Sequence, residues 1–233
     1  MCKVLQIETA SDICSVSMAD CGKIIGIKEN DAGRSHASVL SVFIQELLNE
    51  TEITSDSLDA VAVSIGPGSY TGLRIGVSTA KGMCYGSNIP LIAVPTLQSM
   101  YEGFRQQFGI KGIGNCLFAP MLDARRMEVY TAIFNEDGSM VSDTHAHIIE
   151  NDSFVELLNK NKIYFFGNGA EKLHGVISHP NAIINKEFRL SSVFMTGIAL
   201  NCCKKKDFAN TAYIEPYYLK DFMAILPRKK VLP

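Results

Sequence analysis

Two short apolar runs joined through a glycine-rich turn lie in the stretch 59–95, and this feature restricts the fold more than any other. The first run, 60–65, is rich in β-branched residues and ends at the Gly-Pro-Gly turn 66–68. This pattern is typical of a buried strand that stops at a sharp turn. The second run, 90–94, predicts another buried strand. With a helix between them, the two strands predict a βαβ unit in which they are parallel.

The helix that follows the turn is expected to start at a cap formed by Thr71 or Ser69, to run over about 72–85 and to stop at Gly86. The turn fails as a P-loop because no lysine follows it until Lys81. Backbone amides at a helix start can still hold an anion. A phosphate-binding role is therefore a minor alternative, and it would use Thr9, Ser11, Gly66, Gly68 and Ser69.

One face of this helix consists of small residues. Gly72, Gly76 and Ala80 recur every four residues, with Leu73 and Val77 beside them. A glycine inside a helix costs roughly 0.5–1 kcal/mol relative to alanine, so two on one face indicate a close approach by another backbone. That backbone can belong to the same chain or to a partner, and the sequence leaves both alternatives open.

Composition excludes several classes of protein. The 233 residues include 22 basic and 24 acidic side chains, a balance that does not favour binding to nucleic acid through bulk charge. No apolar run approaches the ~18 residues of a membrane span, and the N-terminus lacks the features of a signal peptide. The seven cysteines are odd in number and unpatterned, which favours reduced thiols in a cytoplasmic protein.

The order of predicted elements repeats. In the first half, strands at 3–9, 13–19 and 24–28 precede an amphipathic helix over 35–48, capped by Ser35, and then the βαβ unit. After a further helix that ends near Phe108, three more strands, a helix, a strand and a helix follow, although 168–190 has no clear pattern. This duplicated β-β-β-α-β-α order is that of the actin, hexokinase and Hsp70 superfamily. We therefore expect an α/β fold with two actin-like domains, at 1–108 and 109–233.

Few side chains outside the glycine-rich turn suggest a catalytic or ligand-binding role. His145 and His147 point to one face of a predicted strand and can bind zinc, but no third ligand is evident and an exposed strand explains them as well. Asp123 and Arg125 can orient a ligand or form a local salt bridge. Basic clusters near the C-terminus indicate a solvated tail or a contact with tRNA phosphates. We predict no catalytic residue, no metal site and no cofactor.

Several motifs resemble those of the TsaB (YeaZ) family. They are I-E-T-A, R-S-H-A-S-V-L, S-I-G-P-G-S-Y-T-G-L-R-I-G-V-S-T-A-K-G, I-A-V-P-T-L-Q-S, M-L-D-A-R-R-M-E-V-Y, G-N-G-A and E-P-Y-Y-L-K, in order along the whole chain. The resemblance implies a subunit of the bacterial machinery that makes threonylcarbamoyladenosine in tRNA. It also implies a duplicated actin-like fold, a catalytic sister, TsaD, and an ATPase, TsaE.

The resemblance also implies that this chain lacks a metal site of its sister. TsaD-like relatives carry a metal-binding His-x-x-x-His after the strand that corresponds to 91–94, and those two places are Thr96 and Met100 here. Neither residue is a ligand for a hard or borderline divalent ion. The chain is therefore expected to be a non-catalytic subunit. The alternatives are a glycoprotease-like metallopeptidase or a nucleotide-dependent enzyme of the actin-like superfamily.

Pairing with the sister is expected to use the two helices at 35–48 and 72–85. Because such surfaces are often self-complementary, a homodimer is expected when the partner is missing, and any contact with tRNA is expected to be indirect or weak. The predicted interface residues are His36, Val39, Leu40, Phe43, Leu47, Gly72, Leu73, Gly76, Val77 and Ala80.

Overall fold

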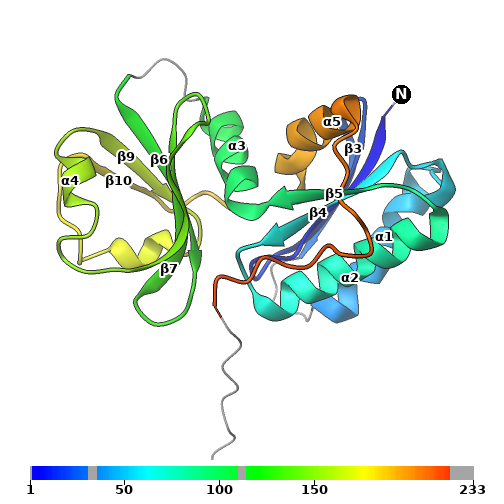
Figure 1. The fold of residues 1–233 in the computed structure, drawn as a ribbon, viewed down its shortest axis with the longest axis horizontal. Helices are drawn as coiled ribbons and strands as arrows, with labels where there is room; N and C mark the ends of the chain where they lie inside the picture. The colour runs from blue at the N-terminus through cyan, green and yellow to red at the C-terminus, as the bar shows by residue number, and fades with distance from the viewer. Residues whose placement is uncertain (1, 31–35, 110–113, 221–233) are drawn as a thin grey trace, which may run out of the picture.

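Two five-stranded mixed sheets form the framework of the protein (Figure 1). The computed structural model describes residues 2–30, 36–109 and 114–220. The first sheet has the order β3-β2-β1-β4-β5, with β1 antiparallel to β2 and parallel to β4. Its strands are β1 (Lys3–Glu8), β2 (Cys14–Asp20), β3 (Lys23–Asn30), β4 (Ala60–Gly66) and β5 (Leu91–Pro95).

The second sheet repeats this topology in the order β8-β7-β6-β9-β10, so the predicted duplicated actin-like fold is confirmed. The unclear stretch 168–190 contains its last strand, which pairs in parallel with β9. The strands are β6 (Cys116–Asp123), β7 (Glu128–Asn135), β8 (Met140–Ile148), β9 (Lys162–Phe166) and β10 (Ala182–Asn185).

The helices connect and cover the sheets. Within the described residues the α-helices are α1 (His36–Glu50), α2 (Tyr70–Ser87), α3 (Thr96–Phe108), α4 (Val155–Leu158) and α5 (Thr196–Lys205). The short 3₁₀ turns in the same ranges are η1 (Ser55–Ser57), η2 (Ala170–Leu173) and η3 (Ser192–Met195). In the part of the chain that the structure describes, none of the helices is long and apolar enough to cross a membrane.

The βαβ unit forms as the sequence predicts, with β4 and β5 parallel. Ser69 caps α2, because its side chain accepts a hydrogen bond from the Gly72 amide at 3.3 Å. The expected stop at Gly86 is wrong by a short distance: α2 runs on to Ser87 and ends at Asn88, which adopts the left-handed conformation that terminates helices. The cap predicted at Ser35 lies outside the described residues.

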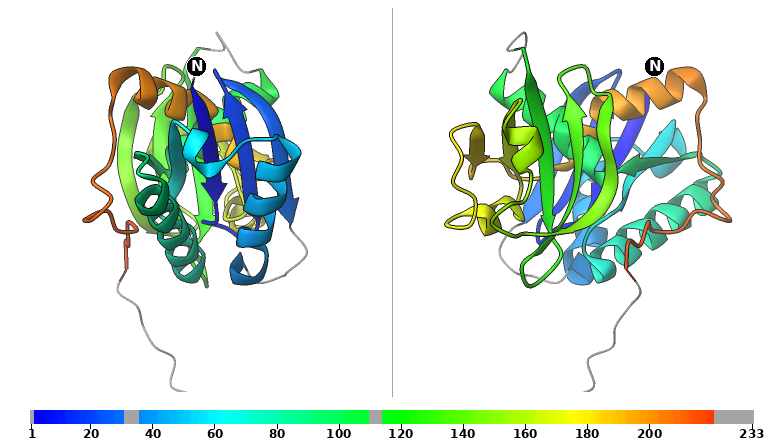
Figure 2. Two further views of the ribbon diagram at one scale, coloured as in Figure 1. Left: turned by 90° about the vertical axis from the view of Figure 1, so that its right-hand side faces the viewer. Right: turned by 60° about the vertical axis from the view of Figure 1, so that its left-hand side comes forward.

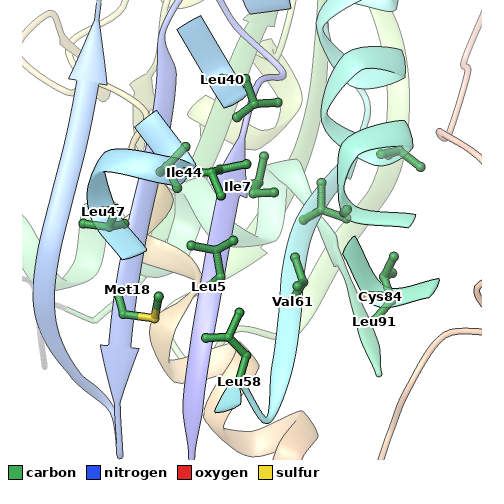
Figure 3. Close-up of a cluster of buried hydrophobic side chains, with 14 of the residues drawn as sticks. Leu5, Ile7, Met18, Leu40, Ile44, Leu47, Leu58, Val61, Cys84 and Leu91 are labelled. Carbon is green, nitrogen blue, oxygen red and sulfur yellow. The ribbon is translucent and has the colours of Figure 1, made fainter. Parts of the chain in front are cut away.

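The first sheet is covered on both faces. Helices α1 and α2 run side by side over one face (Figure 2) and bury a cluster of Leu, Ile and Val side chains beneath them, shown in Figure 3. The opposite face packs against η3 and α5, and Met195 of η3 and Ala199 of α5 lie in one buried cluster with Ala60 and Ala62 of β4. Helix α5 therefore covers the first sheet although it follows the second sheet in the sequence.

Helix α3 does the opposite of α5: it follows β5, the last strand of the first sheet, but packs on the second sheet. It lies between the two sheets in Figure 1, and Phe104 stacks on Phe166 with ring centroids 4.0 Å apart. We therefore propose 1–108 and 109–233 as the two duplicated halves of one cooperative structure, which exchange a covering helix, and not as separately folding units.

Candidate functional site

The small-residue face of α2 packs against the turn between β1 and β2. The Ser69 amide donates to the Ala10 carbonyl at 2.7 Å. A Cβ added at Gly72 would lie 2.0 Å from the Thr9 carbonyl oxygen, and one added at Gly76 would lie 2.3 Å from the Thr9 Oγ1 atom. Both glycines are therefore required by a contact within the chain, which is the first of the two alternatives that the sequence left open.

This contact changes which residues can belong to the predicted partner interface. His36 and Phe43 are half-buried. The other eight residues assigned to that interface are buried in this chain's own core, so their side chains face the sheet and offer no surface to a partner. They are Val39, Leu40, Leu47, Gly72, Leu73, Gly76, Val77 and Ala80.

The outward face of the same two helices is a different set of residues. Val42 of α1 is 48% exposed and Tyr85 of α2 is 88% exposed. Ile75 and Met83 are half-buried on α2, and Gly82 is exposed. The apolar groups of α1 and α2 that are left partly in water therefore lie on this outer face and not on the inner stripe.

A cavity of about 240 Å³ lies between the two halves. Asn168 bridges its mouth by donating to the Asp12 carboxylate at 3.5 Å. The cavity has charges of both signs at its rim, from Asp12, Glu171, Lys186 and Arg189, and an apolar floor. Its lining residues are Ser11, Asp12, Ile13, Met100, Leu122, Gly167, Asn168, Glu171, Lys186, Phe188, Arg189 and Leu190.

Of the five residues considered for phosphate binding, only Ser11 lines this cavity. Thr9 is fully buried under α2. The Gly66 amide donates to the Thr96 Oγ1 atom at 3.1 Å, and the Ser69 amide is occupied by Ala10. A Cβ at Gly68 would lie 2.4 Å from the Ala10 carbonyl oxygen, so the chain itself fills the space in front of this turn. The turn is an internal contact and does not form an anion loop with Thr9 and Ser11.

A buried carboxyl group holds the β1–β2 turn in place. The Glu8 side chain accepts hydrogen bonds from the Ala10 amide and from the Ser64 hydroxyl, each at 2.7 Å, through one oxygen. Its second oxygen has no partner among the described residues. Burial raises the pKa of Glu8 from its ordinary 4.5 to about 7. A single carboxylate beside a turn does not reveal its burial, so the raised pKa of Glu8 is visible only in the structure.

The two places at which the resemblance implies the histidines of a TsaD-like motif are part of the core here. Thr96 and Met100 are both completely buried. The Thr96 hydroxyl accepts a hydrogen bond from the Gly66 amide. Met100 lines the cavity, and its methyl carbon lies against Gly167. Each side chain is therefore occupied in packing or hydrogen bonding.

The two histidines on β8, His145 and His147, are also engaged in hydrogen bonds within the chain. His147 Nε2 is hydrogen-bonded to the Ser153 hydroxyl at 3.0 Å, and His145 Nδ1 to the Asp143 carbonyl at 2.8 Å. Over 2–30, 36–109 and 114–220, no three His, Cys, Asp or Glu side chains are grouped so that they could hold a metal ion.

The sequence did not predict that the segment after α5 returns across the first half. The Ala209 amide donates to the Leu91 carbonyl at 2.8 Å, and the Tyr217 amide to the Ile65 carbonyl at 2.6 Å. The Tyr218 ring then packs against Tyr70 with ring centroids 4.8 Å apart and the ring planes tilted by 36°. The segment 207–220, coloured orange to red in Figure 1, therefore lies along α2 and closes that edge of the sheet.

These features define a protein with a duplicated actin-like fold, in which the space in front of the glycine-rich turn after β4 is filled by the chain itself. Solved structures agree with the fold. Two Pseudomonas aeruginosa proteins, YeaZ and an uncharacterized protein with similarity to peptidase YeaZ, superpose with TM-scores of 0.79 and 0.81. Each is 20% identical and covers 94% of this chain and all of its own. A polyphosphate/ATP-glucomannokinase from Arthrobacter sp. superposes with a TM-score of 0.51 at 10% identity.

Sequence comparison identifies the family. Residues 11–223 match the TsaD family, described as tRNA N6-adenosine threonylcarbamoyltransferase. Escherichia coli TsaB is 32% identical over 135 residues, which are 58% of this chain and 56% of the relative. A Fusobacterium nucleatum tRNA N6-adenosine threonylcarbamoyltransferase is 33% identical over 118 residues, or 43% of this chain and 35% of the relative. The matches thus span about half or less of these relatives. The chain belongs to the TsaD family, and curated proteins of the TsaB group are among its relatives.

Proposed function

We propose that this chain is a non-catalytic subunit of the machinery that makes threonylcarbamoyladenosine in tRNA. In this proposal it scaffolds and activates a TsaD-like catalytic subunit, together with a TsaE-like ATPase, in the cytoplasm. The proposal is supported by the name of the E. coli relative, a tRNA threonylcarbamoyladenosine biosynthesis protein, and by the match to the transferase family.

One observation carries the non-catalytic part of the proposal. Thr96 and Met100 stand where the resemblance to TsaD-like relatives implies metal-binding histidines, and the contacts described above hold both side chains in the core. A threonine hydroxyl that accepts an amide proton and a thioether facing Gly167 supply no imidazole for a divalent ion. The two residues at this place are therefore suited to packing and hydrogen bonding within the chain and not to activating a substrate.

Binding to the partner is proposed to use the outer face of α1 and α2. Val42 and Tyr85 together expose aliphatic and aromatic surface, and aromatic anchors contribute strongly to binding in protein interfaces. A partner of the same duplicated fold presents an equivalent helix pair, so the contact is pseudo-symmetric. The same face would pair with a second copy of this chain when the partner is missing.

Direct binding to tRNA is proposed to be weak or indirect. The formal net charge is −2, and the chain therefore supplies little of the electrostatic attraction on which binding to nucleic acid depends.

A pair of matched valine substitutions tests the docking face. Val42 and Val141 are similarly exposed, at 48% and 45%, but Val141 lies on β8 in the other half of the molecule. Val42→Asp places a charge in the proposed interface and is expected to weaken binding to the TsaD-like subunit by about tenfold or more, measured by calorimetry. Val141→Asp is expected to leave the affinity unchanged. The opposite pattern would place the docking surface elsewhere.

A further inference from the structure

The cavity between the two halves has the size of a small metabolite. Its volume of about 240 Å³ corresponds to roughly eight water molecules, because one water occupies about 30 Å³ of the liquid. Drug-sized ligands fill pockets of about 300–1,000 Å³, so this cavity is suited to a smaller molecule of roughly ten heavy atoms. A nucleotide is considerably larger than this space.

Charged groups of both signs stand at the rim of the cavity, and three of them have no ionic partner. Asp12 comes from the β1–β2 turn, Glu171 from η2, and Lys186 from the position directly after β10. Within the residues that the structure describes, no salt bridge joins any of these three to another side chain. Together with Arg189 they give the rim two acidic and two basic groups. Because the carboxylates would repel a polyanion, the rim favours a ligand that carries one positive and one negative group.

The rest of the lining is mostly apolar. Its apolar side chains are Ile13, Met100, Leu122, Phe188 and Leu190, and none of them is more than 9% exposed. An aliphatic group placed against these side chains would be removed from water, which is favourable. The flexible thioether of Met100 can adapt to the shape of such a group. The cavity therefore combines a charged rim with a lining that suits an aliphatic side chain.

Hydrogen bonds within the chain position the segments that carry the opposite charges. The Asp12 carboxylate accepts a hydrogen bond from the Asn168 side chain at 3.5 Å. The Asn185 side-chain oxygen accepts one from the Phe188 amide at 2.9 Å, and this bond fixes the turn that bears Lys186. Asp12 belongs to the first half of the molecule and Lys186 to the second. A ligand that binds both groups would therefore contact both halves.

We propose that this cavity binds a free α-amino acid with an aliphatic side chain, such as leucine. The Asp12 and Glu171 carboxylates accept hydrogen bonds from the ammonium group of the ligand, and Lys186 donates to its carboxylate. The aliphatic side chain lies against the apolar lining. Because the ligand contacts both halves, its binding holds them together and stabilises the folded chain. The proposal does not depend on the function proposed above, since none of these residues lies on α1 or α2.

Calorimetric titration of the full chain with L-leucine tests the proposal. Saturable binding is expected, and the melting temperature is expected to rise by roughly 5–10 °C when the ligand concentration is about 100 times its Kd. Isocaproate lacks the ammonium group, isoamylamine lacks the carboxylate, and glycine lacks the side chain. Each of the three is expected to bind about tenfold more weakly than L-leucine, or weaker still.

Substitutions at the rim locate the site. Asp12→Asn and Lys186→Met are each expected to weaken the binding of L-leucine about tenfold. Lys160→Met is the matched control, because Lys160 is an exposed lysine after α4 that does not line the cavity, and it is expected to bind L-leucine as the wild type does. The ligand series needs no variant, so it decides the question even if a rim variant fails to fold.

Three results would overturn the proposal. The first is the absence of saturable binding of L-leucine to the wild-type chain at up to about 10 mM. The second is equal binding of L-leucine, isocaproate and isoamylamine, which would mean that the charged groups at the rim are not used. The third is tighter binding of ATP or inorganic phosphate than of L-leucine, which would mean that the cavity selects an anion.

Discussion

Replacement of Gly72 by alanine tests most simply whether the small-residue face of α2 is an internal contact. The new Cβ would lie 2.0 Å from the Thr9 carbonyl oxygen, far inside van der Waals contact. The obstacle is backbone, so no change of rotamer can relieve it. Helix α2 would have to move away from β1, and this would loosen the contacts of Leu73 and Val77 as well.

The net effect can be estimated from two opposing contributions. Forcing an extra methyl group into a packed core costs about 3 kcal/mol, while replacing a helical glycine by alanine recovers about 1 kcal/mol. We therefore expect Gly72→Ala to lower the free energy of unfolding by about 2 kcal/mol, which corresponds to a fall in melting temperature of roughly 4–8 °C for a chain of this size. Gly82 is the matched control on the same helix, because a Cβ there meets nothing within 4 Å. Gly82→Ala is expected to raise the free energy of unfolding by up to about 1 kcal/mol.

Both variants can be measured by urea unfolding of the isolated chain, followed by circular dichroism. Working without the partner matters, because an internal contact must show its effect in the chain alone. Equal stability of Gly72→Ala and the wild type would refute the reasoning, since it would mean that the stripe has room for another atom.

Two further predictions concern the buried acid and the returning C-terminal segment. The raised pKa of Glu8 means that the folded protein binds more protons than the unfolded chain between pH 4.5 and 7, so its contribution to stability falls as the pH rises through this window. Glu8→Gln keeps the acceptor oxygen but removes the charge, and at pH 8 it is expected to be more stable than the wild type by up to about 3 kcal/mol, with no gain at pH 4 in the same urea titration. Tyr218→Ala removes the ring contact with Tyr70 and the hydrogen bond that the Arg74 Nε donates to the Tyr218 hydroxyl at 3.0 Å, so limited proteolysis is expected to cleave 207–220 faster while the core stays intact. Unchanged cleavage would mean that these contacts of Tyr218 do not hold the segment.

Much of the fold could be predicted because it depends on local patterns. The runs 60–65 and 90–94 combine β-branched residues with turn signals at their ends, and both form strands where expected. The duplicated order followed from counting such runs in the two halves. Strand β10 (Ala182–Asn185) was missed because its apolar run is only three residues long, which is too short for its pattern to identify a strand.

The site was less predictable because it depends on which face of an element meets which neighbour. Periodicity placed Gly72 and Gly76 on one stripe but could not distinguish a partner's backbone from Thr9 of the same chain. Lys186 and Arg189 reach the cavity rim from a stretch without any pattern, and only the second sheet brings them opposite Asp12. Complete burial raises the pKa of Glu8 and favours its neutral form. A single carboxylate in a turn does not reveal that burial in the sequence.

The central claim is that this chain takes part in tRNA modification only through a catalytic partner. It is tested most directly by measuring threonylcarbamoyladenosine in tRNA, by mass spectrometry, after incubation with the TsaD-like subunit, the TsaE-like ATPase and the adenylate-forming enzyme, with and without this chain. The account predicts that product accumulates only when this chain is added, and that the chain alone produces none. Product from the isolated chain, or the same yield in its absence, would contradict the account.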